Sequence, residues 1–317
     1  MKINSLQFQE NLSHLDEDEQ ILFVDIVNSI FEIRKKLQGV HAISGDELGK
    51  LAQMAFLSNE TFGDNVSGLL VESKSGNFLI DKADFGVGLE LRRTGAYGTF
   101  ELECINDYIA IDSNVLVVGA HVGTIAIPIS KRCKKVVAIE ANQATYSLLI
   151  KNILLNEAAN CFAFNIAASD VSGKISFLQN IANSGGSKRK PIHDDYMYNY
   201  DSPQEIIIDA EPLDSYLEGQ DFEIIIMDLE GSEYFALQGM QRIVKFARVL
   251  IMEFIPHHLK NVSGVSVDEF LKLVKSFDHL TIPSKGLKVD LKNFSSVLNF
   301  MYDNNISDEG IIFEKLN

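Results

Sequence analysis

The chain has 317 residues, of which 46% are hydrophobic and 23% are charged, and this balance is typical of a globular protein with a buried core. Its 44 acidic and 28 basic residues give a net charge of −16, which argues against nucleic acids and anionic membrane surfaces as partners. A cationic ligand would not be repelled.

Three cysteines, Cys104, Cys133 and Cys161, lie far apart in the sequence and lack the spacing of a metal site. They predict no disulfide framework and favour a reducing compartment. The start of the chain contains no apolar segment of signal-peptide length, and the longest apolar run, residues 115–129, is too short to span a bilayer. We therefore expect a soluble, cytoplasmic protein.

The first expected element is a helix over residues 13–39. Ser13 and Asp16 have the spacing of a capping box, and apolar residues recur after them at helical intervals. We interpret this helix as part of an N-terminal cap. The alternative is a contact with a partner, including a second copy in a homodimer.

Residues 68–110 differ in character from the segments around them. Short strands are expected over residues 68–73 and 77–81, followed by a helix over residues 97–111. We place a domain boundary near residue 105. Residues 1–105 then form a cap of helices and short strands, and residues 106–317 form the larger second domain.

From residue 114 onward, strands alternate with helices. This alternation predicts an α/β fold with a mostly parallel sheet that is covered by helices on both faces. An insertion with a long polar loop, residues 174–211, interrupts the pattern. Strands are expected over residues 114–118, 135–140, 161–167, 222–230, 247–255, 279–284 and 310–316. Helices are expected over residues 143–156, from about residue 232, and over residues 267–277. Asn142 is the expected cap of the first of these helices, and Ser266 and Glu269 form the capping box of the third.

A glycine turn, GAHVG at residues 119–123, follows the first of these strands. Ligands of such sheets bind at the carboxyl ends of the strands, and glycine lets the backbone approach a ligand closely. Glu140 ends the next strand, about 20 residues after Gly119, where a carboxylate can accept the hydroxyl protons of a ribose. The stretch therefore predicts a cofactor that carries a ribose.

Three interpretations of this turn stay open. A dinucleotide site normally has the pattern G-x-G-x-x-G, and the middle glycine is absent here. S-adenosylmethionine has no phosphates and carries a sulfonium cation, which suits an acidic protein. A structural turn without a ligand is the third interpretation.

Several segments between residues 95 and 260 occur in the order of a known family, namely VVGAHVG, AIEAN, NIAASD, PLDSYL, IMDLEGSE and LIMEFIPHHL. Together they resemble the FkbM-type family of S-adenosylmethionine-dependent methyltransferases. The resemblance implies a class I methyltransferase (Rossmann-like) fold with a seven-stranded sheet whose last strand runs antiparallel. It also implies S-adenosylmethionine as the cofactor and O-methylation of a hydroxyl on a small molecule, natural product or sugar.

The same resemblance assigns roles to residues. The methionine part of the cofactor would lie against the glycine turn, the ribose against Glu140, and the adenine after the third strand. An acidic cluster, Asp228, Glu230 and Glu233, follows the fourth strand, and Glu253 ends the fifth. The implied cofactor-binding residues are Gly119, Ala120, His121, Gly123, Glu140, Ala141, Asn142, Ala168, Ser169, Asp170 and Asp228.

Three positions depart from the family pattern. Val117 stands where an acidic residue is usual, His121 where Asn is common, and Ile226 where Lys often precedes the strand-four motif. Loss of the acidic residue removes a polar anchor near the amino end of the methyl donor. A methyltransferase-like protein that binds a partner without catalysis is therefore one alternative, and a nicotinamide-dependent oxidoreductase is another.

Methyl transfer to a hydroxyl needs a base within hydrogen-bond reach, with a pKa near neutrality. His257 and His258 follow the fifth strand and are candidate bases, because an imidazole titrates at about 6.5. Asp228 and Glu230 are alternatives, as bases, as groups that orient the acceptor, or as caps of the next helix. The main interpretation includes no metal, and a divalent ion bound by Glu230, Glu233 and His257 is the alternative.

Two segments of the insertion have open roles. The loop over residues 193–201 mixes acids with three tyrosines, and it is either a lid over the substrate or a surface loop. The basic run SKRK, residues 187–190, is either a contact for an anionic acceptor or a solvated charge run, and we expect the second.

Overall fold

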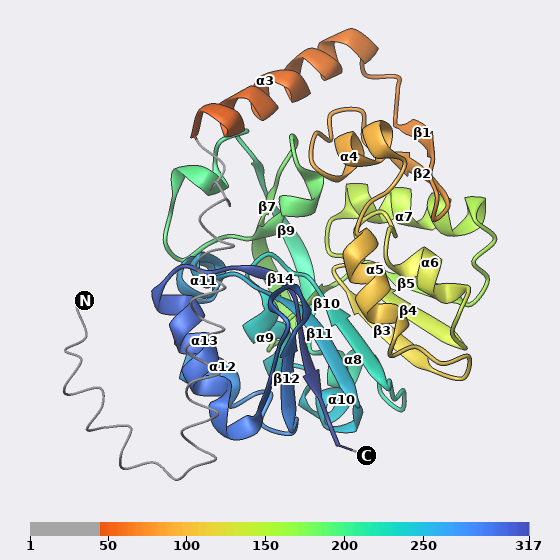
Figure 1. The fold of residues 1–317 in the computed structure, drawn as a ribbon. Helices are drawn as coiled ribbons and strands as arrows, with labels where there is room; N and C mark the ends of the chain where they lie inside the picture. Colours follow the sequence, from red (N-terminus) through yellow and green to blue (C-terminus); the bar gives the residue numbers. More distant parts are fainter. Residues whose placement is uncertain (1–44, 317) are drawn as a thin grey trace. The chain divides into compact units, whose positions relative to one another are not determined.

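A computed structural model of the chain describes residues 45–316, which belong to one compact unit (Figure 1). The expected helix over residues 13–39 lies outside the described residues. The expected domain boundary near residue 105 stays a prediction.

The centre of the unit is an eight-stranded sheet. Its strands run parallel except for β14 (Asp308–Glu314) and the edge strand β13 (Leu287–Asp290). This arrangement confirms the expected α/β architecture with an antiparallel last strand. Across the sheet, the order is β13, β12 (His279–Ile282), β14, β11 (Val249–Phe254), β10 (Ile224–Met227), β3 (Asn114–Val118), β4 (Lys135–Ile139) and β5 (Cys161–Phe164).

The expected number of seven strands is wrong by one, because β13 extends the sheet beyond β12. Within β13 only Val289 is buried, so the strand has no run of apolar residues that its sequence could show. By contrast, β3 and β10 are buried along nearly their whole length. Continuous apolar runs of this kind are typical of strands that are covered on both faces.

Helices flank the sheet in Figure 1. Two of their starts confirm predictions: Asn142 caps α7 by accepting from the Ala144 N–H, and Ser266 and Glu269 form the reciprocal capping box of α12. α12 ends at Leu271, earlier than expected. The helices are α3 (Gly45–Phe62), α4 (Val87–Thr94), α5 (Thr99–Asn106), α6 (Ala126–Ser130), α7 (Gln143–Leu155), α8 (Leu213–Tyr216), α9 (Glu233–Gln238), α10 (Gln241–Phe246), α11 (Pro256–His258), α12 (Val267–Leu271) and α13 (Phe294–Asp303).

Two smaller sheets accompany the central one. The expected strands near residues 70 and 80 form an antiparallel pair, β1 (Leu69–Glu72) and β2 (Asn77–Ile80). The side chain of Asn152 on α7 accepts from the Leu79 N–H at 2.7 Å, which fastens this hairpin to the helix. The insertion forms its own sheet of β6 (Ala167–Ala168), β9 (Gln204–Glu211), β7 (Gly173–Gln179) and β8 (Lys188–Arg189).

Among residues 45–316, no helix combines the length and the apolar character that crossing a bilayer requires.

The glycine turn predicts a measurable packing effect. Gly123 and Gly219 both have left-handed backbones, with φ of +96° and +74°. A Cβ at Gly123 would lie 2.7 Å from Ile127 and 2.9 Å from Leu149, whereas at Gly219 it would meet open space. Gly219→Ala should lower the free energy of unfolding by about 1 kcal/mol for the backbone alone. Gly123→Ala should cost a further ~1–3 kcal/mol for overpacking, as measured by urea unfolding. Equal losses would contradict this packing role.

Candidate active site

A cavity of about 1150 Å³, including its open mouth, lies at the carboxyl ends of the parallel strands β3, β4 and β10. This is the edge at which sheets of this type bind their ligands. The strands β6, β7 and β8 of the insertion and the segments around Val87 and Tyr97 complete its wall.

The glycine turn after β3 brings the chain against the end of β10. Gly119 has a φ of +87°, and a Cβ there would lie 1.7 Å from the carbonyl oxygen of Asp228. A residue with a side chain therefore cannot occupy this position without moving the backbone. Both Gly119 and Ala120 donate their N–H groups to the Ile139 carbonyl at 2.9 Å, which holds the turn at the floor of the cavity.

Glu140 is a buried carboxylate at the end of β4, and it lines the cavity. One oxygen accepts from the His121 N–H and the other from the Asn142 N–H, each at 2.8 Å. Burial raises the pKa of Glu140 to about 7, although these two N–H groups act in the opposite direction. Each carboxylate oxygen has a second lone pair, so Glu140 can also accept hydroxyl protons from a ligand.

His121 reaches into the cavity from the glycine turn with a φ of +48°, which is uncommon for a residue with a side chain. Its Nε2 lies 2.7 Å from the Ser184 hydroxyl, which donates in turn to the buried Asp84 carboxylate. The imidazole therefore donates through Nε2, and burial lowers its pKa. His121 Nδ1 is buried and has no hydrogen-bond partner among the described residues.

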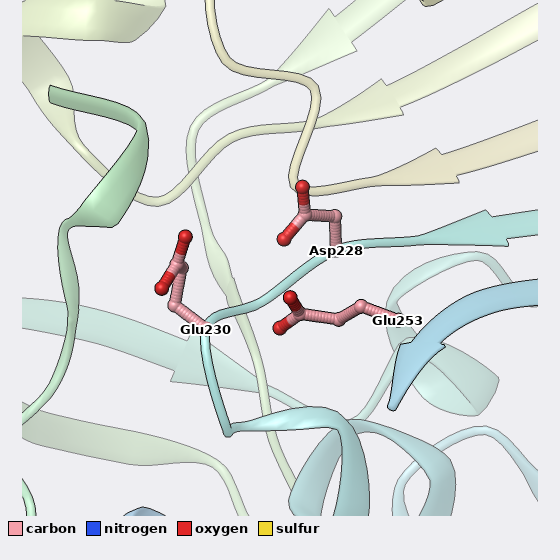
Figure 2. Close-up of side chains that lie close together, drawn as sticks. All are labelled: Asp228, Glu230 and Glu253. Carbon is pink, nitrogen blue, oxygen red and sulfur yellow. The ribbon is translucent and has the colours of Figure 1, made fainter. Parts of the chain in front are cut away.

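Carboxylates gather at the ends of β10 and β11. Asp228 and Glu230 line the cavity, and the buried Glu253 lies close to both (Figure 2). The Lys188 ammonium contacts Glu230 Oε2 at 3.1 Å and is itself buried. The expectation that residues 187–190 are a solvated charge run is therefore wrong at Lys188.

The carboxylates of this cluster titrate differently. The Asp228 side chain is open to the cavity but otherwise enclosed by protein, and burial and the nearby Glu230 raise its pKa well above the ordinary value. Burial also acts to raise the pKa of Glu230, but Lys188 and His258 outweigh it, and the pKa lies below its ordinary value. Asp228 is consequently the more basic of the two.

The two candidate histidine bases do not line the cavity. His258 is buried, and its ring nitrogens lie 3.4 Å from Glu230 Oε2 and 3.5 Å from Glu253 Oε1. Burial lowers its pKa to about 3, so the ring is neutral and a weak base. His257 Nδ1 lies 3.0 Å from the hydroxyl of Tyr198, which anchors the tyrosine-rich loop at that residue. A role for either histidine as the base stays a prediction.

The predicted site residues divide into two groups. The cavity lining contains Gly119, Ala120, His121, Glu140, Ala141, Ala168, Asp228 and Glu230. It does not contain Gly123, Asn142, Ser169 or Asp170. Gly123 packs against Ile127 and Leu149, Asn142 caps α7, and Ser169 bonds to Asp170, so these four support the site from behind.

Glu233 has a supporting role as well. Its carboxylate accepts from the Leu229 N–H at 2.8 Å and from the Gly231 N–H at 3.3 Å. The alternative interpretation was that Asp228 or Glu230 caps the helix after β10. Glu233 forms these bonds to the backbone N–H groups instead. The predicted metal set is also different, because the grouped oxygen ligands belong to Asp228, Glu230 and Glu253, without Glu233 or His257.

Sequence reasoning missed five residues around the cavity, namely Asp84, Tyr97, Ser184, Lys188 and Arg189. They lie before residue 105 or in the insertion, far in sequence from the glycine turn. The basic run at residues 187–190 was the one signal that could have indicated Lys188 and Arg189.

Comparisons with known proteins agree with this geometry. Residues 118–282, just over half of the chain, match the methyltransferase FkbM domain. No curated protein matches the sequence significantly.

Similar solved structures include a tRNA m1G37 methyltransferase of M. jannaschii (16% identity, TM-score 0.40) and Trm5b of Pyrococcus abyssi (13%, 0.42). Each match covers 80% of this chain but only 56% and 57% of those proteins, so this chain spans little more than half their length. A TehB-like SAM-dependent methyltransferase of Corynebacterium glutamicum (12%, 0.40) matches over 72% of this chain and 94% of its own. What these proteins act on is not carried over to this chain.

The raised pKa of Glu140 predicts a pH-dependent stability. Between its ordinary value of 4.5 and about 7, the unfolded chain loses this proton while the folded chain keeps it. Stability should therefore fall as pH rises through this window. Between these two pH values, the free energy of unfolding of the wild type should fall by up to about 3 kcal/mol relative to that of Glu140→Gln, as measured by urea unfolding at each pH. The exposed Glu218→Gln should follow the wild type, and parallel curves for wild type and Glu140→Gln would contradict the assignment.

Proposed function

Because the chain belongs to the FkbM methyltransferase family and its cofactor is therefore S-adenosylmethionine, we propose that it transfers a methyl group to a hydroxyl oxygen of a small molecule, natural product or sugar. The observation that carries the proposal is Glu140. Its carboxylate is held by two backbone N–H groups at the rim of a cavity that also contains acidic side chains.

The residues present fit this cofactor. Glu140 would accept the ribose hydroxyls, and Ala168 and its neighbours would contact the adenine. The turn from Gly119 to His121, which lines the cavity, would hold the methionine part. The cofactor supplies a methyl group that is already activated on a positively charged sulfur, so the chain has to align the reactants and remove one proton.

Asp228 is the residue that we assign to this proton. It lines the cavity, and its raised pKa makes it a better base than an ordinary carboxylate. As the acceptor oxygen gains the methyl group, its proton would pass to Asp228. Glu230, held ionised by Lys188, would accept a hydrogen bond from the acceptor and orient it.

The family departures at Val117 and Ile226 do not by themselves argue for loss of function. These two residues are direct partners in the register of β3 and β10, and both line the cavity. Where the family has an acid and a lysine, this chain has two apolar side chains, so neither change leaves an unpaired charge. Replacement of both residues together favours a site that still binds its cofactor over one that has lost its function.

The other interpretations have less support. A nicotinamide cofactor would need the middle glycine of its loop, but that position holds the side chain of His121. A binding protein without catalysis would explain Val117 alone, but not the paired change at Ile226. A cytoplasmic location and a possible homodimer stay predictions.

Donor binding is the first test of the proposed function. Glu140→Ala removes an acceptor of two ribose hydrogen bonds, each worth at most about 1.5–3 kcal/mol. We expect S-adenosylmethionine to bind the wild type in calorimetry and the variant at least ~10-fold more weakly. Glu218→Ala is the matched surface control. No binding to the wild type at millimolar donor would refute the proposal, and unchanged binding to a folded Glu140→Ala would remove Glu140 from the site.

Methyl transfer tests the role of Asp228. With donor labelled at its methyl group and a panel of hydroxyl compounds, mass spectrometry should locate the label on an oxygen of the product. Asp228→Asn should lower kcat by about 100-fold or more, since a positioned base contributes at least that much. A label on nitrogen or carbon would contradict O-methylation, and an Asp228→Asn variant with wild-type kcat would assign the base elsewhere.

A further inference from the structure

We propose that Asp228, Glu230 and Glu253 bind one divalent cation, of the Mg²⁺ or Mn²⁺ type, at the end of β10 and β11. Binding of the ion follows from the arrangement of these side chains. Its role in holding the acceptor hydroxyl rests on the proposed function.

The three side chains converge. One oxygen of each carboxylate lies within 4.8 Å of the others, and Figure 2 shows the carboxylates grouped between the two strand ends. Oxygen ligands lie about 2.0–2.1 Å from Mg²⁺, so two ligands of one ion are at most about 4.2 Å apart, and the three carboxylates would move together by a few tenths of an ångström on binding it. The convergence is built into the sheet, because β10 and β11 are parallel neighbours in which Met227 pairs with Met252.

A second observation points to a ligand that the protein itself does not supply. Glu253 is only 8% exposed, and its Oε1 has no hydrogen-bond partner among the described residues. Buried carboxylate oxygens are normally bonded to a donor or to a metal. Figure 2 shows the Glu253 side chain directed toward Asp228 and Glu230, so the unpartnered oxygen belongs to a group that reaches into the cluster.

His258 does not satisfy this oxygen. The imidazole lies between two carboxylates, and its Nε2 is 3.4 Å from Glu230 Oε2. Its Nδ1, which faces Glu253 at 3.5 Å, is likewise buried and without a partner in the described part of the chain. A cation beside Glu253 would compensate the charge that this imidazole leaves uncompensated.

The charge balance leads to the same conclusion. Lys188 contacts Glu230 Oε2 and the Gly186 carbonyl, and so it is committed to one carboxylate of the three. Among residues 45–316, neither Asp228 nor Glu253 forms an ion pair with a lysine or an arginine. A divalent ion would offset the charges of both, with Lys188 remaining on the outer oxygen of Glu230.

The position of the ion gives it a function. Asp228 and Glu230 line the cavity, whereas Glu253 lies behind them, so a cation held by the three would have its open coordination positions toward the cavity. A hydroxyl oxygen bound there would have a lowered pKa and a fixed direction relative to the methyl donor. In that state the ion would activate the acceptor hydroxyl in place of Asp228, which as a ligand would no longer be free to accept the proton.

Manganese binding tests the site without relying on turnover. Full-length protein, freed of metal with a chelator, is titrated with Mn²⁺ and followed by electron paramagnetic resonance in the absence of donor. We expect one Mn²⁺ per chain with a Kd below about 1 mM, and competition by Mg²⁺. Glu253→Gln and Glu230→Gln should each weaken binding by at least about tenfold. Asp209→Asn, on the exposed face of β9, is the matched control and should bind as the wild type does.

The outcomes are separable from those of the proposed function. Donor binding by calorimetry together with no Mn²⁺ binding up to several millimolar would overturn the cation site and leave methyl transfer intact, with Lys188 as the sole compensating charge. Equal Mn²⁺ affinity in Glu253→Gln, Glu230→Gln and Asp209→Asn would also overturn it. Mn²⁺ binding that depends on Glu253 in a protein that binds no donor would support the site and refute methyl transfer.

Discussion

The site depends on a buried carboxylate that joins two backbone segments. Glu140 accepts the N–H of His121 in the glycine turn with one oxygen and that of Asn142 at the start of α7 with the other. A buried charge or polar group destabilises the fold unless it forms hydrogen bonds, so Glu140 keeps both of its bonds to backbone N–H groups. The two bonds thereby fix the distance between the glycine turn and α7. What remains of the carboxylate faces the cavity. One interaction therefore positions the floor of the cavity and, under the proposed function, places the carboxylate that would accept the ribose hydroxyls.

The second constraint is electrostatic. At the ends of β10 and β11, Glu253 is buried and Glu230 half-buried, where charge is poorly screened, and the buried Lys188 pairs with Glu230. The result is a pair of cavity carboxylates with different properties, because Asp228 is pushed toward protonation while Glu230 is held ionised. Glu230 also has a left-handed backbone, with a φ of 53°, as does His121 across the cavity. Strain of this kind persists where the surrounding structure holds the residue in place, and it often coincides with function.

The chain shows how a binding site changes without losing its architecture. Val117 and Ile226 are neighbours across β3 and β10, and the family pattern places opposite charges there. Removing one charge would leave its partner buried and unpaired, at a high cost in stability, whereas removing both leaves an apolar contact. Nearby, the His121 imidazole is held by Ser184, whose hydroxyl donates to Asp84.

The sequence alone was sufficient for the alternation of the main strands with α7, α9 and α12, though not for α13, and for the glycine turn, the caps at Asn142 and Ser266, and Glu140 at the end of its strand. Each of these depends on periodicity or on contacts within a few residues, which a sequence displays directly. It was not sufficient for β13, whose one buried residue leaves no pattern, nor for Lys188, which reads as a surface charge but lies buried against Glu230. The grouping of Asp228 with Glu253, and of Asp84 with Ser184 and His121, was decided only by the tertiary structure. These partners are brought together by strand order and by the insertion's own sheet, and contacts between distant segments leave no local signal in the chain.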